Sequence, residues 1–126
     1  MKQIIFKLSL TNHNTPFEIT INNFLFEYGI GKEKCGSKDL TLQYALKIQG
    51  LKEMNIIKNY IENIAPYLTN DNNIKEIQIK IINNEDNNEN IDITVKQNEF
   101  ENFNMTYVID NNPRVMITFS VQKVPE

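Results

Sequence analysis

The residue types that could support nucleophilic catalysis occur once each, as Cys35 and His13. A thiolate nucleophile needs a neighbouring base, and histidine is the usual one. His13 stands between Asn12 and Asn14 in a predicted turn, and nothing in the spacing brings it to Cys35. We therefore expect a surface histidine and no enzymatic activity. A lone cysteine excludes an internal disulfide. We interpret it as an incidental free thiol, with pairing between chains or a reactive thiol as the alternatives.

Metal and phosphate sites are also poorly supported. A zinc site needs about four histidine or cysteine ligands, and the chain has one residue of each type. Three glycines, Gly29, Gly31 and Gly36, are not followed by the Gly-Lys-Ser/Thr element of a phosphate-binding loop. Four acidic residues lack the spacing and the glycine of a calcium loop and instead predict a solvated hairpin loop. They are Glu85, Asp86, Glu89 and Asp92. We predict no metal and no cofactor.

Charge and aromatic content give no sign of a nucleic-acid partner. The formal net charge is -3, and acidic and basic residues are interspersed. The aromatic series Phe24, Phe26 and Tyr28 contains Glu27 and no interleaved basic residue. Stacking platforms for single strands combine aromatic rings with a basic groove. We therefore expect these rings in the core, and no sequence-specific binding of nucleic acid.

Length and hydropathy indicate one domain that includes all 126 residues. No stretch approaches the roughly 20 apolar residues that span a bilayer, so we expect no membrane partner. Lys7 and Ser9 interrupt the apolar run at the N-terminus, which favours a strand over a signal peptide. We expect synthesis in the reducing cytoplasm.

The first part of the chain alternates between apolar and polar residues, which predicts strands. Residues 2–10 form the first predicted strand. In the second, the apolar set moves from Phe17, Ile19 and Ile21 to the other parity after Asn22-Asn23. A shift of one residue moves side chains to the opposite face, so we predict a bulge or sharp bend there.

The period changes once, at Gly50. Residues 40–49 alternate as a strand, and the next apolar residues follow the three-four spacing of a helix face. We expect this helix to start at Leu51 and to end between Ile64 and Leu68, because Pro66 ends or kinks a helix. Its apolar stripe is Met54, Ile57, Ile61, Ile64 and Leu68.

Four alternating segments follow the helix, at residues 77–81, 91–95, 103–109 and 115–121. The Asn-rich stretch 83–90 predicts a hairpin between the first two, and Asp110-Asn111-Asn112-Pro113 is a strong turn signal. The predicted fold is mainly β with one helix, in an antiparallel barrel or sandwich, in the order of about three strands, helix, four strands. No internal repeat is visible in the sequence.

The order of these segments resembles Hcp, the tube protein of type VI secretion systems, and the phage tail-tube proteins that share its layout. The resemblance rests on Ile4-Ile5-Phe6-Lys7-Leu8, on residues 18–29 with their alternating aromatics, on the polar stretch 29–39, on the single central helix, and on the closing segments 100–107 and 115–121. It is a resemblance of pattern across nearly the whole chain. The chain is shorter than typical members of the family, and it lacks their signals before the helix.

The resemblance implies a structural protein that assembles into hexameric rings and stacked tubes. Its partners would be its own copies, secreted effectors, and sheath or spike proteins. After synthesis the chain itself would be secreted or assembled into an extracellular tube. An extended loop would contact the next subunit, and it comprises Gly31, Lys32, Glu33, Lys34, Cys35, Gly36, Ser37 and Lys38. The polar side of the helix would face the lumen through Asn55, Lys58, Asn59 and Glu62.

A different class fits the same composition. A small acidic binding module, such as a toxin-immunity protein or a phage-encoded inhibitor, would also have no catalytic groups. Such a module would remain monomeric or dimeric and bind one partner tightly, whereas a tube protein would form rings.

Overall fold

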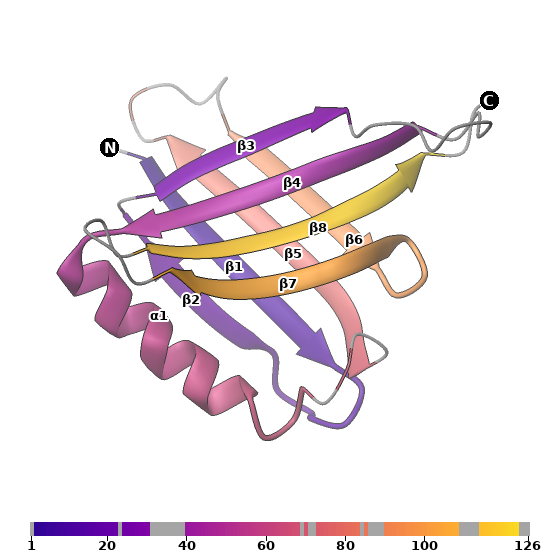
Figure 1. Cartoon of the computed structure of the whole chain (residues 1–126), viewed down its shortest axis with the longest axis horizontal. Helices are drawn as coiled ribbons and strands as arrows, with labels where there is room; N and C mark the ends of the chain where they lie inside the picture. Colours follow the sequence, from indigo (N-terminus) through magenta and orange to yellow (C-terminus); the bar gives the residue numbers. More distant parts are fainter. Residues whose placement is uncertain are drawn as a thin grey trace.

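The computed structural model describes residues 2–22, 24–30, 40–68, 70, 73–83, 85, 90–108 and 114–123. This part of the chain contains eight strands and one helix (Figure 1). In chain order they are β1 (Lys2–Leu10), β2 (Phe17–Ile21), β3 (Phe24–Ile30), β4 (Leu40–Gln49), α1 (Leu51–Ile64), β5 (Ile74–Asn83), β6 (Ile91–Lys96), β7 (Phe100–Val108) and β8 (Arg114–Lys123).

The strands form two antiparallel sheets of four. Sheet A has the order β2-β1-β5-β6 and sheet B the order β3-β4-β8-β7. Within the described residues no strand of one sheet pairs with a strand of the other, so the sheets do not close on each other. The prediction of a mainly β fold with one helix is confirmed. The architecture is a sandwich, and the barrel alternative is wrong.

The chain changes sheets where the apolar parity shifts. Ile19 and Ile21 of β2 are buried in sheet A, and Phe24 begins β3 in sheet B. The bend predicted at Asn22-Asn23 therefore lies at a passage between sheets, although Asn23 itself is outside the described residues. For this reason four strands, and not about three, precede the helix.

The helix begins at the single change of period. Gly50 precedes it with φ 100°, a backbone angle that residues other than glycine rarely adopt. The backbone N–H of Met54 donates to the Gly50 carbonyl at 2.8 Å, which closes the first turn. The helix ends at Ile64, and Pro66 lies in the turn that follows, as its ring requires. No helix of the described residues is long and apolar enough to cross a membrane.

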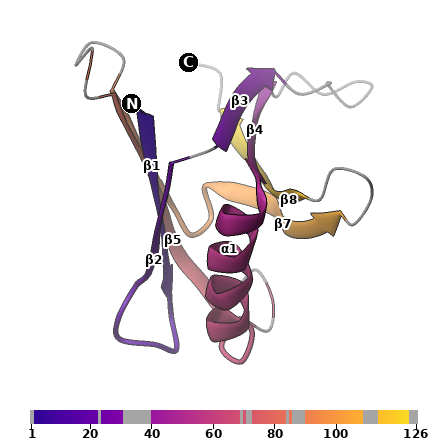
Figure 2. The ribbon, with the colours of Figure 1, turned by 90° about the vertical axis from the view of Figure 1, so that its left-hand side faces the viewer.

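Figure 2 shows α1 beside both sheets, and the buried side chains of the helix belong to the common core of the sandwich. Ile57 and Ile64 are almost fully buried, and the helix contacts β2 of sheet A and β4 and β8 of sheet B. The Tyr60 hydroxyl donates to the Phe17 carbonyl at 2.8 Å, and its ring lies edge-on to Phe6 with centroids 6.2 Å apart. The helix thus covers one end of the sandwich.

The two halves of the chain repeat one arrangement. In each half a hairpin of sheet A is followed by a hairpin of sheet B, as β1-β2 then β3-β4 and as β5-β6 then β7-β8. β1 pairs with β5 and β4 with β8 at the sheet centres, so the halves are related by an approximate two-fold axis. The axis passes near the opposed pairs Phe6–Ile79 and Tyr44–Phe119. This repeat is topological, and the sequence does not show it because equivalent positions share only apolar character.

Candidate binding surface

The two groups of residues suggested by the Hcp resemblance have different outcomes. The expected contact loop, from Gly31 to Lys38 and including Cys35, lies outside the described residues. The expected lumen-facing residues all lie exposed on α1, opposite its buried stripe. They are Asn55, Lys58, Asn59 and Glu62.

His13 is held by contacts within its own turn and with the segment that follows α1. Its Nδ1 lies 3.3 Å from the Thr15 backbone N–H, and its ring is 4.7 Å from Phe17 and 4.6 Å from Tyr67. The ring is half-buried, so the expectation of a plain surface histidine is only partly met. Its packing ties the β1-β2 turn to the end of α1, which is a structural role.

Two of the four acidic residues in and after the β5-β6 connection belong to the described residues. Glu85 and Asp92 are exposed, and Asp86 and Glu89 lie outside the described residues. Among the residues described, no group of three or more His, Cys, Asp or Glu side chains could hold a metal ion.

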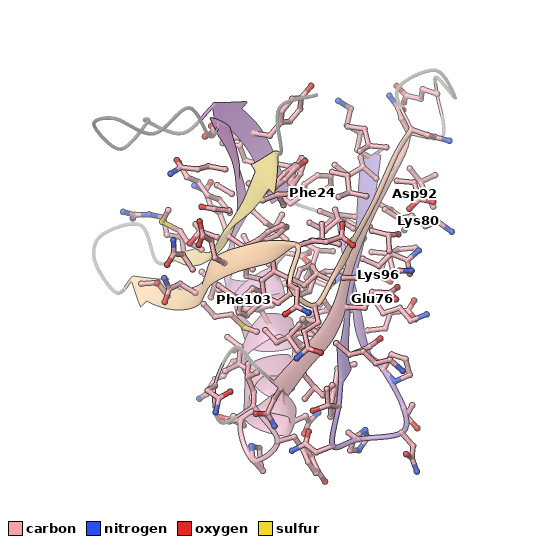
Figure 3. All side chains as sticks on the ribbon, turned by 90° about the vertical axis from the view of Figure 1, so that its right-hand side faces the viewer. Phe24, Glu76, Lys80, Asp92, Lys96 and Phe103 are labelled. Atoms are coloured by element: carbon pink, nitrogen blue, oxygen red, sulfur yellow. The ribbon has the colours of Figure 1, made fainter. Side chains whose placement is uncertain are left out.

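The outer face of sheet A is polar and carries complementary charges. On β5 and β6, Glu76 lies directly opposite Lys96, and Lys80 directly opposite Asp92. Figure 3 shows these four on the side of sheet A that faces away from sheet B, whereas Phe24 and Phe103 lie between the sheets. Opposite charges at facing positions favour the observed strand pairing.

An aromatic row crosses the inner face of sheet B. Tyr28 of β3 lies opposite Tyr44 of β4, and Tyr44 opposite Phe119 of β8. Phe103 completes the row at a β7 irregularity beside Asn102, whose φ is 58°. The successive ring centroids are 6.3, 5.1 and 6.4 Å apart, distances typical of interacting aromatic pairs.

Burial changes sharply along this row. Phe103 and Phe119, on the side of α1, are 7% and 3% exposed. Tyr44 is half-buried, and Tyr28 at the far end is 67% exposed. Burial raises the pKa of Tyr44 from its usual value of 10.0, and the neighbouring Tyr28 raises it further. One end of an interior row therefore reaches solvent.

Sheet A has an equivalent row with the same asymmetry. It consists of Ile19, Phe6, Ile79 and Ile93, directly opposed across β2, β1, β5 and β6. Ile19, beside α1, is 6% exposed, whereas Ile93 on the far edge strand is only half-buried. We call the apolar surface at this end of both sheets, in which Tyr28 is exposed and the other side chains are half-buried, the open seat. It is formed by Tyr28, Tyr44, Ile91, Ile93 and Val121.

The covered end retains a small groove. It has a volume of about 290 Å³ and lies between the last turn of α1 and β7. Its apolar walls are Ile61, Ile64, Ala65, Leu68, Phe103 and Met105. The groove is thus a gap at the edge of the helix interface, with few polar groups to orient a ligand.

A second hollow lies on sheet B. It has a volume of about 330 Å³, and its lining includes Gln43, Asn102, Asn104, Thr118 and Ser120. Amides and hydroxyls offer hydrogen bonds there, and the two aromatic residues of the lining, Tyr44 and Phe119, are half-buried and buried, so the hollow offers no exposed ring as an anchor. Tight protein interfaces usually centre on buried aromatic or arginine anchors, so the open seat is the stronger candidate.

The alternation of residues located the inner faces but not the open seat. We expected Phe24, Phe26 and Tyr28 in the core, and this is wrong for Tyr28, while Phe24 and Phe26 are half-buried. In the described residues a helix follows the first pair of hairpins, β1-β2 and β3-β4, and none is described after the second pair, β5-β6 and β7-β8. This difference becomes apparent only once the pairing of the strands is known.

No family model matches the chain, and neither a curated protein nor a solved structure shows significant similarity to it.

Proposed function

We propose that this chain is a non-catalytic module that binds another protein through the open seat. The observation that carries the proposal is the exposure of Tyr28, at 67%, in a row whose other end is buried. Aromatic rings beside half-buried aliphatic side chains are typical of the centres of protein interfaces. A toxin-immunity protein or a phage-encoded inhibitor is a module of this class.

The chemistry of the open seat suits a protein better than a small molecule. Tyr28 and Tyr44 present flat apolar rings, each with a hydroxyl that can form hydrogen bonds at the rim of an interface. Ile91 and Ile93 lie on β6, which is an edge strand of sheet A. The seat therefore combines apolar contact area with a strand edge, where unpaired backbone groups can bind another chain.

The experiment compares three forms of the protein as immobilised baits in an extract of the source cells. We expect the wild-type protein and Leu25→Ser to retain a partner that Tyr28→Ser loses. Leu25 is the matched control, because it lies on the same strand, is 48% exposed and points to the other face of the sheet. If all three baits retain the same proteins, the proposal is contradicted.

Assembly into rings or tubes is the second candidate, and the open edges of both sheets favour it. In the described residues β2 and β6 form the edges of sheet A, and β3 and β7 those of sheet B. Edge strands can pair between subunits. The polar side of α1, with Lys58 and Glu62, is also exposed and could face a lumen. The open sandwich, however, differs from the barrel that the Hcp resemblance implies.

Light scattering with negative-stain microscopy over a range of concentrations separates the two candidates. The binding module remains a monomer or dimer, and the tube protein forms rings. Shortening the stretch 32–38 tests the ring further, since it should abolish assembly without unfolding the domain.

A further inference from the structure

We infer that the open seat binds an amphipathic α-helix of a partner protein, in the position that the two-fold axis makes equivalent to that of α1. This inference rests on the proposed function and names its class of partner. It follows from the repeat of topology, from the match of side chains at equivalent positions, and from the difference in their exposure.

The topological repeat defines where the equivalent helix would lie. α1 follows β4 and packs against the edge strand β2 and against sheet B. The axis relates β2 to β6, β7 to β3 and β4 to β8. In Figure 1 α1 lies at the lower left, and the end of β3 lies on the opposite side, at the upper right. The described residues place no helix on that side.

Side chains at equivalent positions have matching chemistry. Ile19 beside α1 corresponds to Ile93, because Phe6 and Ile79 pair with them in one row. Phe103 corresponds to Tyr28, because both flank the central Tyr44–Phe119 pair. Each pair is conservative in size and apolar character, so both ends of the sandwich present similar surfaces.

Exposure separates the two ends. Ile19, on the strand that α1 contacts, is 6% exposed, and Phe103, across the groove from the last turn of α1, is 7% exposed. Their counterparts Ile93 and Tyr28 are half-buried and 67% exposed. The surface that α1 protects on one side is thus available on the other.

The seat of α1 indicates what the partner helix must carry. Ile57, Tyr60 and Ile64 occupy spacings of three and four and face the sheets, with Tyr60 donating to a backbone carbonyl of the edge strand. Helix-in-groove recognition uses the same spacing of apolar anchors. The partner helix therefore presents an aliphatic stripe with an aromatic residue near its centre.

The test uses a fluorescein-labelled peptide with the sequence of residues 51–68 as the probe, titrated with the full chain and followed by anisotropy. We expect saturable binding, weakened at least about tenfold by Tyr28→Ala and by Ile93→Asp, as expected of interface hot spots. Leu25→Ala should leave the affinity unchanged. Tyr28→Ala keeps the test valid if Ile93→Asp unfolds, because Tyr28 is largely exposed.

Two results would overturn the inference. One is the absence of binding to the labelled peptide at up to about 1 mM of the full chain, the limit of weak affinity. The other is binding that Tyr28→Ala leaves unchanged, which would mean that the peptide replaces α1 in its own seat.

Nitration of tyrosines in the free protein, read by mass spectrometry, separates this failure from failure of the proposed function. Tyr28 should react fast, and Tyr60, at 6% exposure, should not. A reactive Tyr28 without peptide binding removes only the helix as partner. An unreactive Tyr28 means that the seat is covered in the free protein, and both proposals fail.

Discussion

The two ends of the sandwich have similar surfaces and different environments. At one end α1 covers Ile19 and Phe103, and at the other Ile93 and Tyr28 are partly or largely exposed. The same apolar side chain contributes to stability where it is covered and is available for binding where it is not. The helix inserted between the two halves therefore leaves one end of the sandwich buried and the equivalent surface at the other end accessible.

The largest expected difference in stability is between truncations at the two ends of the aromatic row. Phe103→Ala should lower the free energy of unfolding by about 3–5 kcal/mol, because it opens a cavity under the helix. Tyr28→Ala should change it by no more than about 0.5 kcal/mol, as expected for an exposed position. Urea denaturation measures both values. Equal losses would show that the open seat is covered in solution.

The matched pair in sheet A should behave in the same way with a smaller difference. Ile19→Ala should cost about 2–4 kcal/mol, since Ile19 is 6% exposed beside α1. Ile93→Ala should cost about 1 kcal/mol, because part of its surface already meets solvent. Thermal and urea unfolding of the two variants side by side provide the check. A greater loss for Ile93→Ala would reverse the assignment of the ends.

The buried Tyr60 at the covered end should make the stability of the fold depend on pH. Burial raises the pKa of Tyr60 far above its usual value of 10.0, so the folded state keeps it protonated where the unfolded state loses its proton. The contribution of protonated Tyr60 to the free energy of unfolding should be complete below pH 10. Above pH 10 the free energy of unfolding should fall by up to about 1.4 kcal/mol per pH unit.

Tyr60→Phe is the control for this dependence. The variant should lose about 1 kcal/mol at neutral pH, because the Phe17 carbonyl loses its donor. It should also show a weaker fall above pH 10. Urea unfolding at a series of pH values measures both effects, and an unchanged alkaline slope would contradict the role of Tyr60.

The smallest effect concerns the edge strand of the open seat. Lys96→Glu places two carboxylates opposite each other, with Glu76 on β5, and should cost about 0.5 kcal/mol. Adding Glu76→Lys to this variant restores opposite charges and should recover the loss. Urea midpoints of the single and double variants test this, and a double variant no more stable than the single one would contradict the pairing.

The sequence predicted the local elements well because their causes are local. The change of period at Gly50, the end of the helix before Pro66 and the bend at Asn22 follow from backbone geometry and side-chain alternation. Each of these is observed in the structure.

Pairing between distant strands could not be predicted in this way. The alternation gives Tyr28 and Phe103 the same inward orientation, and only the tertiary structure shows that one is exposed and the other buried. The order β2-β1-β5-β6 depends on contacts between residues far apart in the chain, and local patterns do not encode it. The open seat was missed for that reason.

The charges on the outer face of sheet A also favour one register between β5 and β6. Glu76 faces Lys96 and Lys80 faces Asp92 in the native pairing, whereas a slip of four residues in one direction would place Glu76 against Asp92. The same slip in the other direction would place Lys80 against Lys96. A slip by an even number of residues keeps the isoleucines on the inner face, so the apolar alternation excludes only odd slips. The opposed charges therefore favour the register that places Ile91 and Ile93 in the open seat.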